Sequence, residues 1–222
     1  MNKEHTELVF ILDRSGSMGG LESDTIGGFN AMLMKQRALK GECRITTVLF
    51  NSELTVLHDR IDIEAVQPIT EKEYAVGGCT ALLDAIGTTI DRIVKDRKKS
   101  PEGYRAGKVM FVIITDGLEN SSREYSSKRI RQKISEQKEK YGWEFIFLGA
   151  DLSAVETADD LGISRNRATV YNSDHAGTRL NYEVMSEAAA QFRTNGMMDE
   201  DCLAPIREDA EKRRGRKEEC KR

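Results

Sequence analysis

Short apolar runs alternate along this chain with longer segments in which apolar residues recur at helical spacing. Four runs are almost continuously apolar and rich in β-branched and aromatic residues, which predicts strands buried on both faces. They span residues 8–12, 44–50, 108–115 and 143–149. The polar pair Asn51-Ser52 separates the second run from residues 54–58, and this predicts a hairpin with one antiparallel strand. A weaker run at residues 168–171 is typical of an edge strand.

The segments between these runs carry the helical pattern. A capping-box spacing, Ser121-Ser122-Arg123-Glu124, predicts that one helix opens there. We expect helices over residues 21–39, 80–94, 121–141, 153–161 and 182–192. The alternation of strands and helices predicts an α/β fold, in which a doubly wound (Rossmann-like), mostly parallel central sheet with one antiparallel strand has helices on both faces.

The character of the chain changes after Gly196. Residues 207–222 mix eight basic with five acidic residues, and residues 197–222 show little apolar periodicity. We therefore expect one domain over residues 1–196 and a charged C-terminal tail over residues 197–222. A solvated or frayed helical tail is favoured over an arm that binds nucleic acid.

Composition narrows the class of protein. The 34 Lys and Arg residues nearly balance 37 Asp and Glu residues, so no overall basic field indicates a nucleic-acid partner. No apolar stretch is long enough to span a membrane, and the first residues do not resemble a secretory signal. The four cysteines are scattered, without zinc-site spacing. We expect a cytoplasmic monomer with reduced thiols.

Candidate chemistry gathers where two of the apolar runs end. The first run leads into Asp13, followed by Ser15 and Ser17 at alternate positions, and the run at residues 108–115 leads into Asp116. In open α/β sheets ligands bind outside the carboxyl ends of the strands. Carboxylate and hydroxyl oxygens suit a hard cation such as Mg²⁺ or Mn²⁺, and a site with few carboxylates keeps coordination positions open.

This arrangement resembles the von Willebrand factor A domain family and its metal-ion-dependent adhesion site (MIDAS). That site combines a D-x-S-x-S turn, a threonine in a later loop, and a strand-ending aspartate. The matching residues are Asp13, Ser15, Ser17, Thr80 in Gly77-Gly78-Cys79-Thr80, and Asp116 in Thr115-Asp116-Gly117. The match is nearest to intracellular bacterial and phage members.

The resemblance implies a role for each residue. Ser15 and Ser17 would ligate the metal directly, and Thr80 would do so directly or through water. Asp13 and Asp116 would lie close, often with a bridging water. An acidic side chain from a partner protein would take the sixth position. The chain is then a metal-dependent protein–protein interaction module and not an enzyme.

A metal-dependent hydrolase of phosphate esters, using the same strand ends, is the alternative. No G-x-S-x-G nucleophile elbow and no P-loop lysine pattern support catalysis. A third possibility is a nucleic-acid accessory role for residues 207–222.

Several polar residues near the site have plainer interpretations. Asp84 is expected to cap or to pair and not to ligate, while Thr80 could also cap its helix. Glu119 and Asn120 are expected to be ordinary surface residues. Arg14 is expected to face solvent or pair with an acid, and Cys79 to be a packed thiol.

Overall fold

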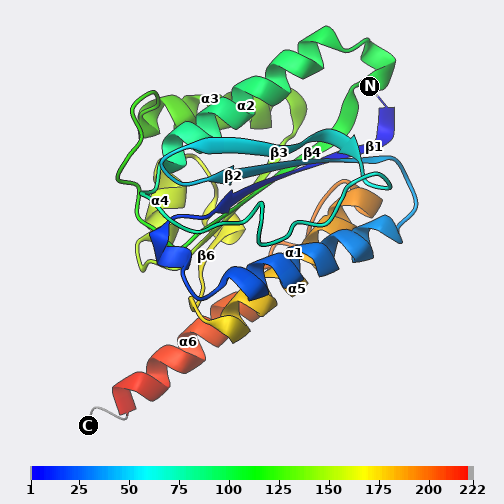
Figure 1. The fold of residues 1–222 in the computed structure, drawn as a ribbon. Coiled ribbons are helices and arrows are strands. Elements are labelled where there is room, and N and C mark those ends of the chain that lie inside the picture. Colours follow the sequence, from blue (N-terminus) through cyan, green and yellow to red (C-terminus); the bar gives the residue numbers. More distant parts are fainter. Residues whose placement is uncertain (1, 220–222) are drawn as a thin grey trace.

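A six-stranded sheet forms the centre of the computed structural model, which describes residues 2–219 (Figure 1). Its order is β3-β2-β1-β4-β5-β6. Only β3 runs antiparallel, against β2. The strands are β1 (Asn2–Asp13), β2 (Cys43–Phe50), β3 (Leu54–Asp62), β4 (Ala106–Thr115), β5 (Glu144–Gly149) and β6 (Ala168–Val170). The predicted fold class is confirmed, including the antiparallel strand.

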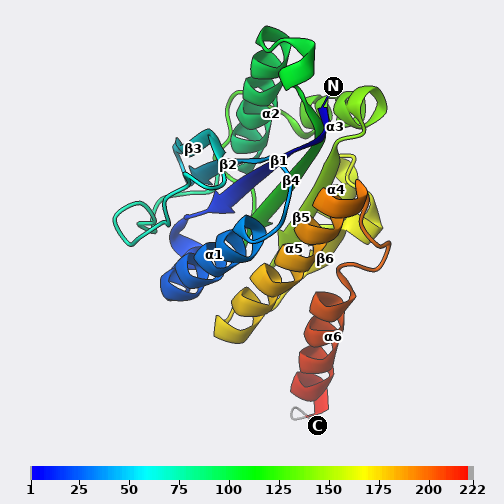
Figure 2. The same ribbon diagram turned by 90° about the vertical axis from the view of Figure 1, so that its right-hand side faces the viewer.

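Helices cover both faces of the sheet (Figures 1 and 2). One face packs against α1 (Glu22–Arg37), α5 (His175–Asn195) and the start of α6 (Ala204–Glu219). The other face packs against α2 (Leu82–Lys99), α3 (Ser127–Tyr141) and α4 (Ala154–Asp160). Three short 3-10 turns complete the described elements: η1 (Gly16–Met18), η2 (Glu102–Tyr104) and η3 (Arg165–Arg167).

The central strand β1 shows why its sequence is an unbroken apolar run. Successive side chains of a strand point to opposite faces. Leu8, Phe10 and Leu12 accordingly join the core beneath α1 and α5, whereas Val9 and Ile11 join the core beneath α2. All five are buried, and each contributes roughly 1.5–3 kcal/mol of transfer free energy.

Two helices begin at different residues from those predicted. Helix α3 starts at Ser127 and is capped by the Ser126 hydroxyl, so residues 121–124 lie in the preceding loop and do not form a capping box. Helix α5 starts at His175, well before residue 182, and is capped by the Asp174 carboxylate. It ends at Asn195, three residues beyond the predicted end, and its C-cap Gly196 has a φ of +77° that suits glycine.

The segment after Gly196 is more ordered than a solvated tail. Leu203, Ile206 and Ala210 are buried. Further along, Arg213 forms ion pairs with Asp174 and Asp209. The expectation of a solvated tail is therefore wrong for residues 203–210, although the second half of α6 projects from the body in Figure 1. The domain boundary at residue 196 stays a prediction.

Among the helices within residues 2–219, none has both the length and the apolar character that crossing a bilayer requires.

The strand order creates a switch point between β1 and β4. From β1 the chain crosses to β2 on one side, whereas from β4 it crosses to β5 on the other. The two strands pair in parallel, with Leu12 opposite Ile114, so their carboxyl ends lie side by side. At such a switch point the connections diverge and leave a crevice for ligands. This brings Asp13 and Asp116 to one place.

A pair of neighbouring glycines in α1 tests the packing of α1 on α5. A Cβ atom at Gly28 would lie 2.4 Å from Cδ2 of Tyr182, whereas one at Gly27 would meet nothing within 4 Å. Gly28→Ala should therefore lower the free energy of unfolding by about 1–3 kcal/mol. Gly27→Ala should raise it by up to about 1 kcal/mol, because alanine is the better helix former. Urea unfolding of both variants measures the difference, and equal stabilities would contradict the close packing.

Candidate metal centre

Asp13 ends β1 as a buried carboxylate with both oxygens engaged. Its Oδ1 accepts the backbone N–H of Ser15 at 2.7 Å, and its Oδ2 accepts the hydroxyl of Thr115, the last residue of β4, at 2.6 Å. The Tyr74 hydroxyl donates to the Asp13 carbonyl. These bonds hold Asp13 in one orientation and tie the ends of β1 and β4 together.

Ser15 and Ser17 lie on the turn that follows Asp13. The chain forms η1 here, which leaves Ser15 buried and Ser17 exposed. Their Oγ atoms are 3.0 Å apart. The Ser17 hydroxyl also donates to Oδ1 of Asp116 at 2.5 Å. The Ser17 hydroxyl therefore lies between the Ser15 hydroxyl and the carboxylate from the neighbouring strand.

Gly117 shows where the hydroxyl oxygens converge. A Cβ atom at this glycine would lie 2.4 Å from Oγ1 of Thr80, 3.2 Å from Oγ of Ser17 and 3.3 Å from Oγ of Ser15. Three hydroxyls from two distant segments thus surround one small space, and only a glycine leaves that space open. The structure brings together all five residues predicted from the sequence.

Asp116 is half-buried directly after β4. Burial raises the pKa of its carboxyl group, and the negative charge of Asp13 raises it further. Hydroxyl donors oppose this effect, because Ser17 donates to Oδ1 and Ser173 donates to Oδ2 at 3.1 Å. Two carboxylates held this close favour a cation between or beside them.

Ser173 is a site residue that the sequence did not reveal. It lies immediately before the capping residue Asp174 at the start of α5. Its place beside Asp116 depends on how the last helix docks. The only local signal is the polar Asn172-Ser173-Asp174 stretch, which also describes an ordinary helix start.

Asn120 fastens the loop after β4 to Thr80. Its Oδ1 accepts the N–H of Thr80 at 2.9 Å, and its own N–H donates to the Thr80 carbonyl at 3.1 Å. The N-cap residue of α2 is Ala81, so Thr80 does not cap that helix. Asn120 lies at the surface as expected, and it also fixes the Thr80 backbone beside the site.

Glu119 secures the same loop to the start of α2. Its carboxylate accepts the N–H groups of Ser121 and Ser122, the Ser122 hydroxyl, and the N–H of Leu83. The expectation that Glu119 is an ordinary surface residue is thus wrong. Buried polar groups need such partners, so removing this carboxylate would leave several donors unpaired.

Asp84 pairs as predicted and does not face the metal ligands. Its carboxylate accepts three consecutive backbone N–H groups, those of residues 123, 124 and 125. These bonds keep residues 121–124 out of α3.

Two further residues differ from expectation. Arg14 donates to the Thr55 hydroxyl and the Glu73 carbonyl, so it neither faces solvent freely nor pairs with an acid. Cys79 is exposed and not packed.

The donor set at this site is three hydroxyls and two carboxylates. Within residues 2–219, no group of three or more His, Cys, Asp or Glu residues is arranged to hold a metal ion. Hydroxyl and carboxylate oxygens without nitrogen or sulfur suit a hard divalent cation. The three hydroxyls gathered beside Gly117 and the burial that raises the pKa of Asp116 both fit such a cation.

Solved structures with a similar fold include proximal thread matrix protein 1 from the mussel byssus, at 15% identity and a TM-score of 0.58. The match covers 86% of this chain and 48% of the mussel chain, so this chain spans about half its length. A von Willebrand factor type A protein from Catenulispora acidiphila matches at 16% identity and a TM-score of 0.55, over 85% of this chain and 43% of that one.

The manganese-loaded TRAP protein of Plasmodium vivax matches at 17% identity and a TM-score of 0.53, over 81% of this chain and 73% of that one. No curated protein gives a significant sequence match. At the level of sequence families, residues 7–183 match the von Willebrand factor type A domain, which is most of the chain. With the strand order and the site geometry, this match shows that the chain belongs to the von Willebrand factor type A domain family.

Proposed function

We propose that this chain is a divalent-metal-dependent protein-interaction module. Its metal site consists of Asp13, Ser15, Ser17, Thr80 and Asp116, and the bound metal takes an acidic side chain from a partner protein. The convergence of three hydroxyls on the space above Gly117, beside two carboxylates, carries this proposal. A bound cation supplies an open coordination position for a carboxylate oxygen.

Mg²⁺ or Mn²⁺ is the proposed metal. One structure of the mussel protein has a zinc-occupied MIDAS motif, and the Plasmodium protein is manganese-loaded. Oxygen ligands alone favour magnesium or manganese over zinc here, since zinc prefers nitrogen and sulfur. Among this chain's own residues, Asp13 orients the serine turn, whereas Ser17 and Asp116 form the exposed side of the site.

Hydrolysis of phosphate esters is the weaker candidate. A carboxylate that acts as a nucleophile or general base has to point toward the substrate. Both Asp13 oxygens already accept hydrogen bonds from Ser15 and Thr115, and both Asp116 oxygens accept bonds from serines. These contacts favour carboxylates that hold a metal and its ligands in place.

Metal binding should depend on the open space at Gly117. Gly117→Ala places a methyl group among the three hydroxyls, so we expect it to abolish metal binding without unfolding the chain. At about a hundred times its Kd, Mg²⁺ or Mn²⁺ should stabilise the wild type by about 2.7 kcal/mol and the variant not at all. Thermal unfolding with and without metal measures this.

The matched control is Gly103→Ala, because a Cβ atom at Gly103 meets nothing within 4 Å. It should keep the full metal-dependent stabilisation. Equal responses of the wild type and both variants to metal would place the metal elsewhere.

Partner binding should require both metal and the buried hydroxyl. Ser15→Ala removes one ligand, so proteins that the wild type captures in Mg²⁺ should not be captured by the variant. With EDTA, neither the wild type nor the variant should capture them. Ser23→Ala, an exposed serine on α1, should behave as wild type. Quantitative mass spectrometry of captured proteins measures the ratios. Capture unchanged by EDTA, or phosphoester turnover that disappears in Asp116→Ala, would contradict the proposed function.

A further inference from the structure

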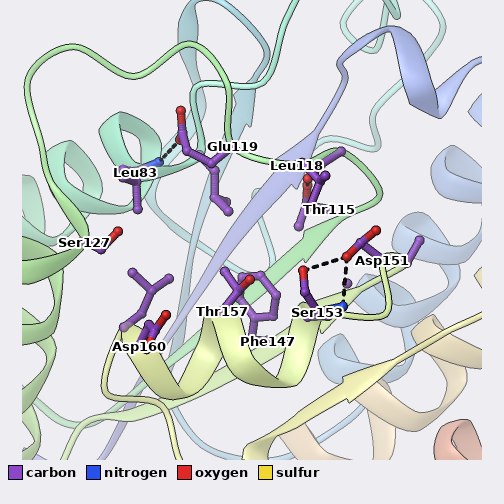
Figure 3. Close-up of a pocket in the computed structure, with 16 residues that line it drawn as sticks. Leu83, Thr115, Leu118, Glu119, Ser127, Phe147, Asp151, Ser153, Thr157 and Asp160 are labelled. Carbon is purple, nitrogen blue, oxygen red and sulfur yellow. Dashed lines mark hydrogen bonds between the residues drawn. The ribbon is translucent and has the colours of Figure 1, made fainter.

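A cavity of about 270 Å³ lies beside the metal site, between the loop after β4, the start of α2 and helix α4 (Figure 3). It opens at the carboxyl ends of β4 and β5. Thr115 and Gly117 line this cavity, and the same two residues contact Asp13 and the three hydroxyls of the metal site. A protein segment that places a side chain on the metal therefore has this cavity within reach.

Part of the cavity lining is apolar. Phe147 lies at its floor, and Leu82, Leu83 and Leu161 contribute further buried surface (Figure 3). At the rim, Leu118 is 57% exposed. An aliphatic chain inserted here would be removed from water together with part of Leu118.

The charged residues that line the cavity are all acidic. Of its sixteen lining residues, none is Lys, Arg or His, whereas three are acidic: Glu119, Asp151 and Asp160. Glu119 is occupied by backbone donors. Asp160 is exposed, and hydrogen bonds from Ser153 lower the pKa of Asp151, which keeps it ionised. A second carboxylate from a partner would be repelled, and a cation would be attracted.

We propose that this cavity receives a lysine or arginine side chain of the partner whose carboxylate binds the metal. The proposal rests on the proposed function and specifies its partner: an acidic residue with a basic residue nearby. Long basic side chains bury their aliphatic stem and keep the charged end in water. The leucines and Phe147 would contact the stem, while Asp160, at the opposite end of α4 from Asp151, would face the charged end.

Synthetic peptides provide the probe. Each contains one glutamate, and each nearby position in turn carries lysine, arginine, leucine, glutamate or alanine. Binding to the full chain is measured in Mg²⁺ and in EDTA. We expect peptides with a basic residue at a favoured position to bind about fivefold more tightly than their alanine versions, in Mg²⁺ only.

Two adjacent aspartates on α4 give a matched pair of variants. Asp160 lines the cavity and Asp159 does not, yet substitution by lysine changes the net charge equally. Asp160→Lys should lose the preference for basic peptides, whereas Asp159→Lys should keep it. Thr157→Phe, which fills the cavity from the same helix, should also lose it, and its thermal unfolding confirms that it folds. Asp151→Asn, which removes one negative charge, should weaken the preference for basic peptides to a smaller extent.

The outcomes separate the two proposals. The wild-type chain could bind the glutamate peptides in a Mg²⁺-dependent way but prefer leucine peptides, or show no preference among the peptides. Either result overturns the basic-residue proposal and leaves the proposed metal function unaffected. Equal effects of Asp160→Lys and Asp159→Lys would also overturn it, since they would reflect net charge alone. If no glutamate peptide binds in a Mg²⁺-dependent way, both proposals fail.

Discussion

The parallel pairing of β1 with β4 places two carboxylates side by side at one edge of the sheet, and the surrounding structure depends on keeping them there. Burying negative charge is costly unless donors or a cation offset it. The Ser15 N–H and the hydroxyls of Thr115, Ser17 and Ser173 supply that compensation. The raised pKa of Asp116 shows that the compensation is incomplete.

Much of this arrangement could be predicted from local sequence. Strands buried on both faces produce continuous apolar runs, and an aspartate that ends such a run identifies the carboxyl edge of the sheet. The serines at alternate positions after Asp13 belong to the same short turn. Their convergence with Asp116 therefore followed from strand pairing alone.

Other features depend on contacts between distant segments. The start of α3 was mispredicted because Glu119 takes the N–H of Ser121 and Asp84 takes that of Glu124, the two groups that a capping box would have used. Ser173 reaches Asp116 only because α5 docks on the sheet. Leu203 and, within α6, Ile206 and Ala210 are buried in a highly charged segment, and they are too few to produce a periodic pattern.

The loop after β4 links the metal site to the rest of the chain. Asn120 holds Thr80, while Glu119 and Asp84 fix the same loop to α2, so the third hydroxyl is positioned by residues that do not themselves face the metal. The bond between a carboxylate and a metal is the same whichever protein supplies the carboxylate, so it does not distinguish one partner from another. In the proposed module, selectivity among partners would therefore come from surfaces next to the metal, and the loop that positions Thr80 also forms one wall of the adjacent cavity.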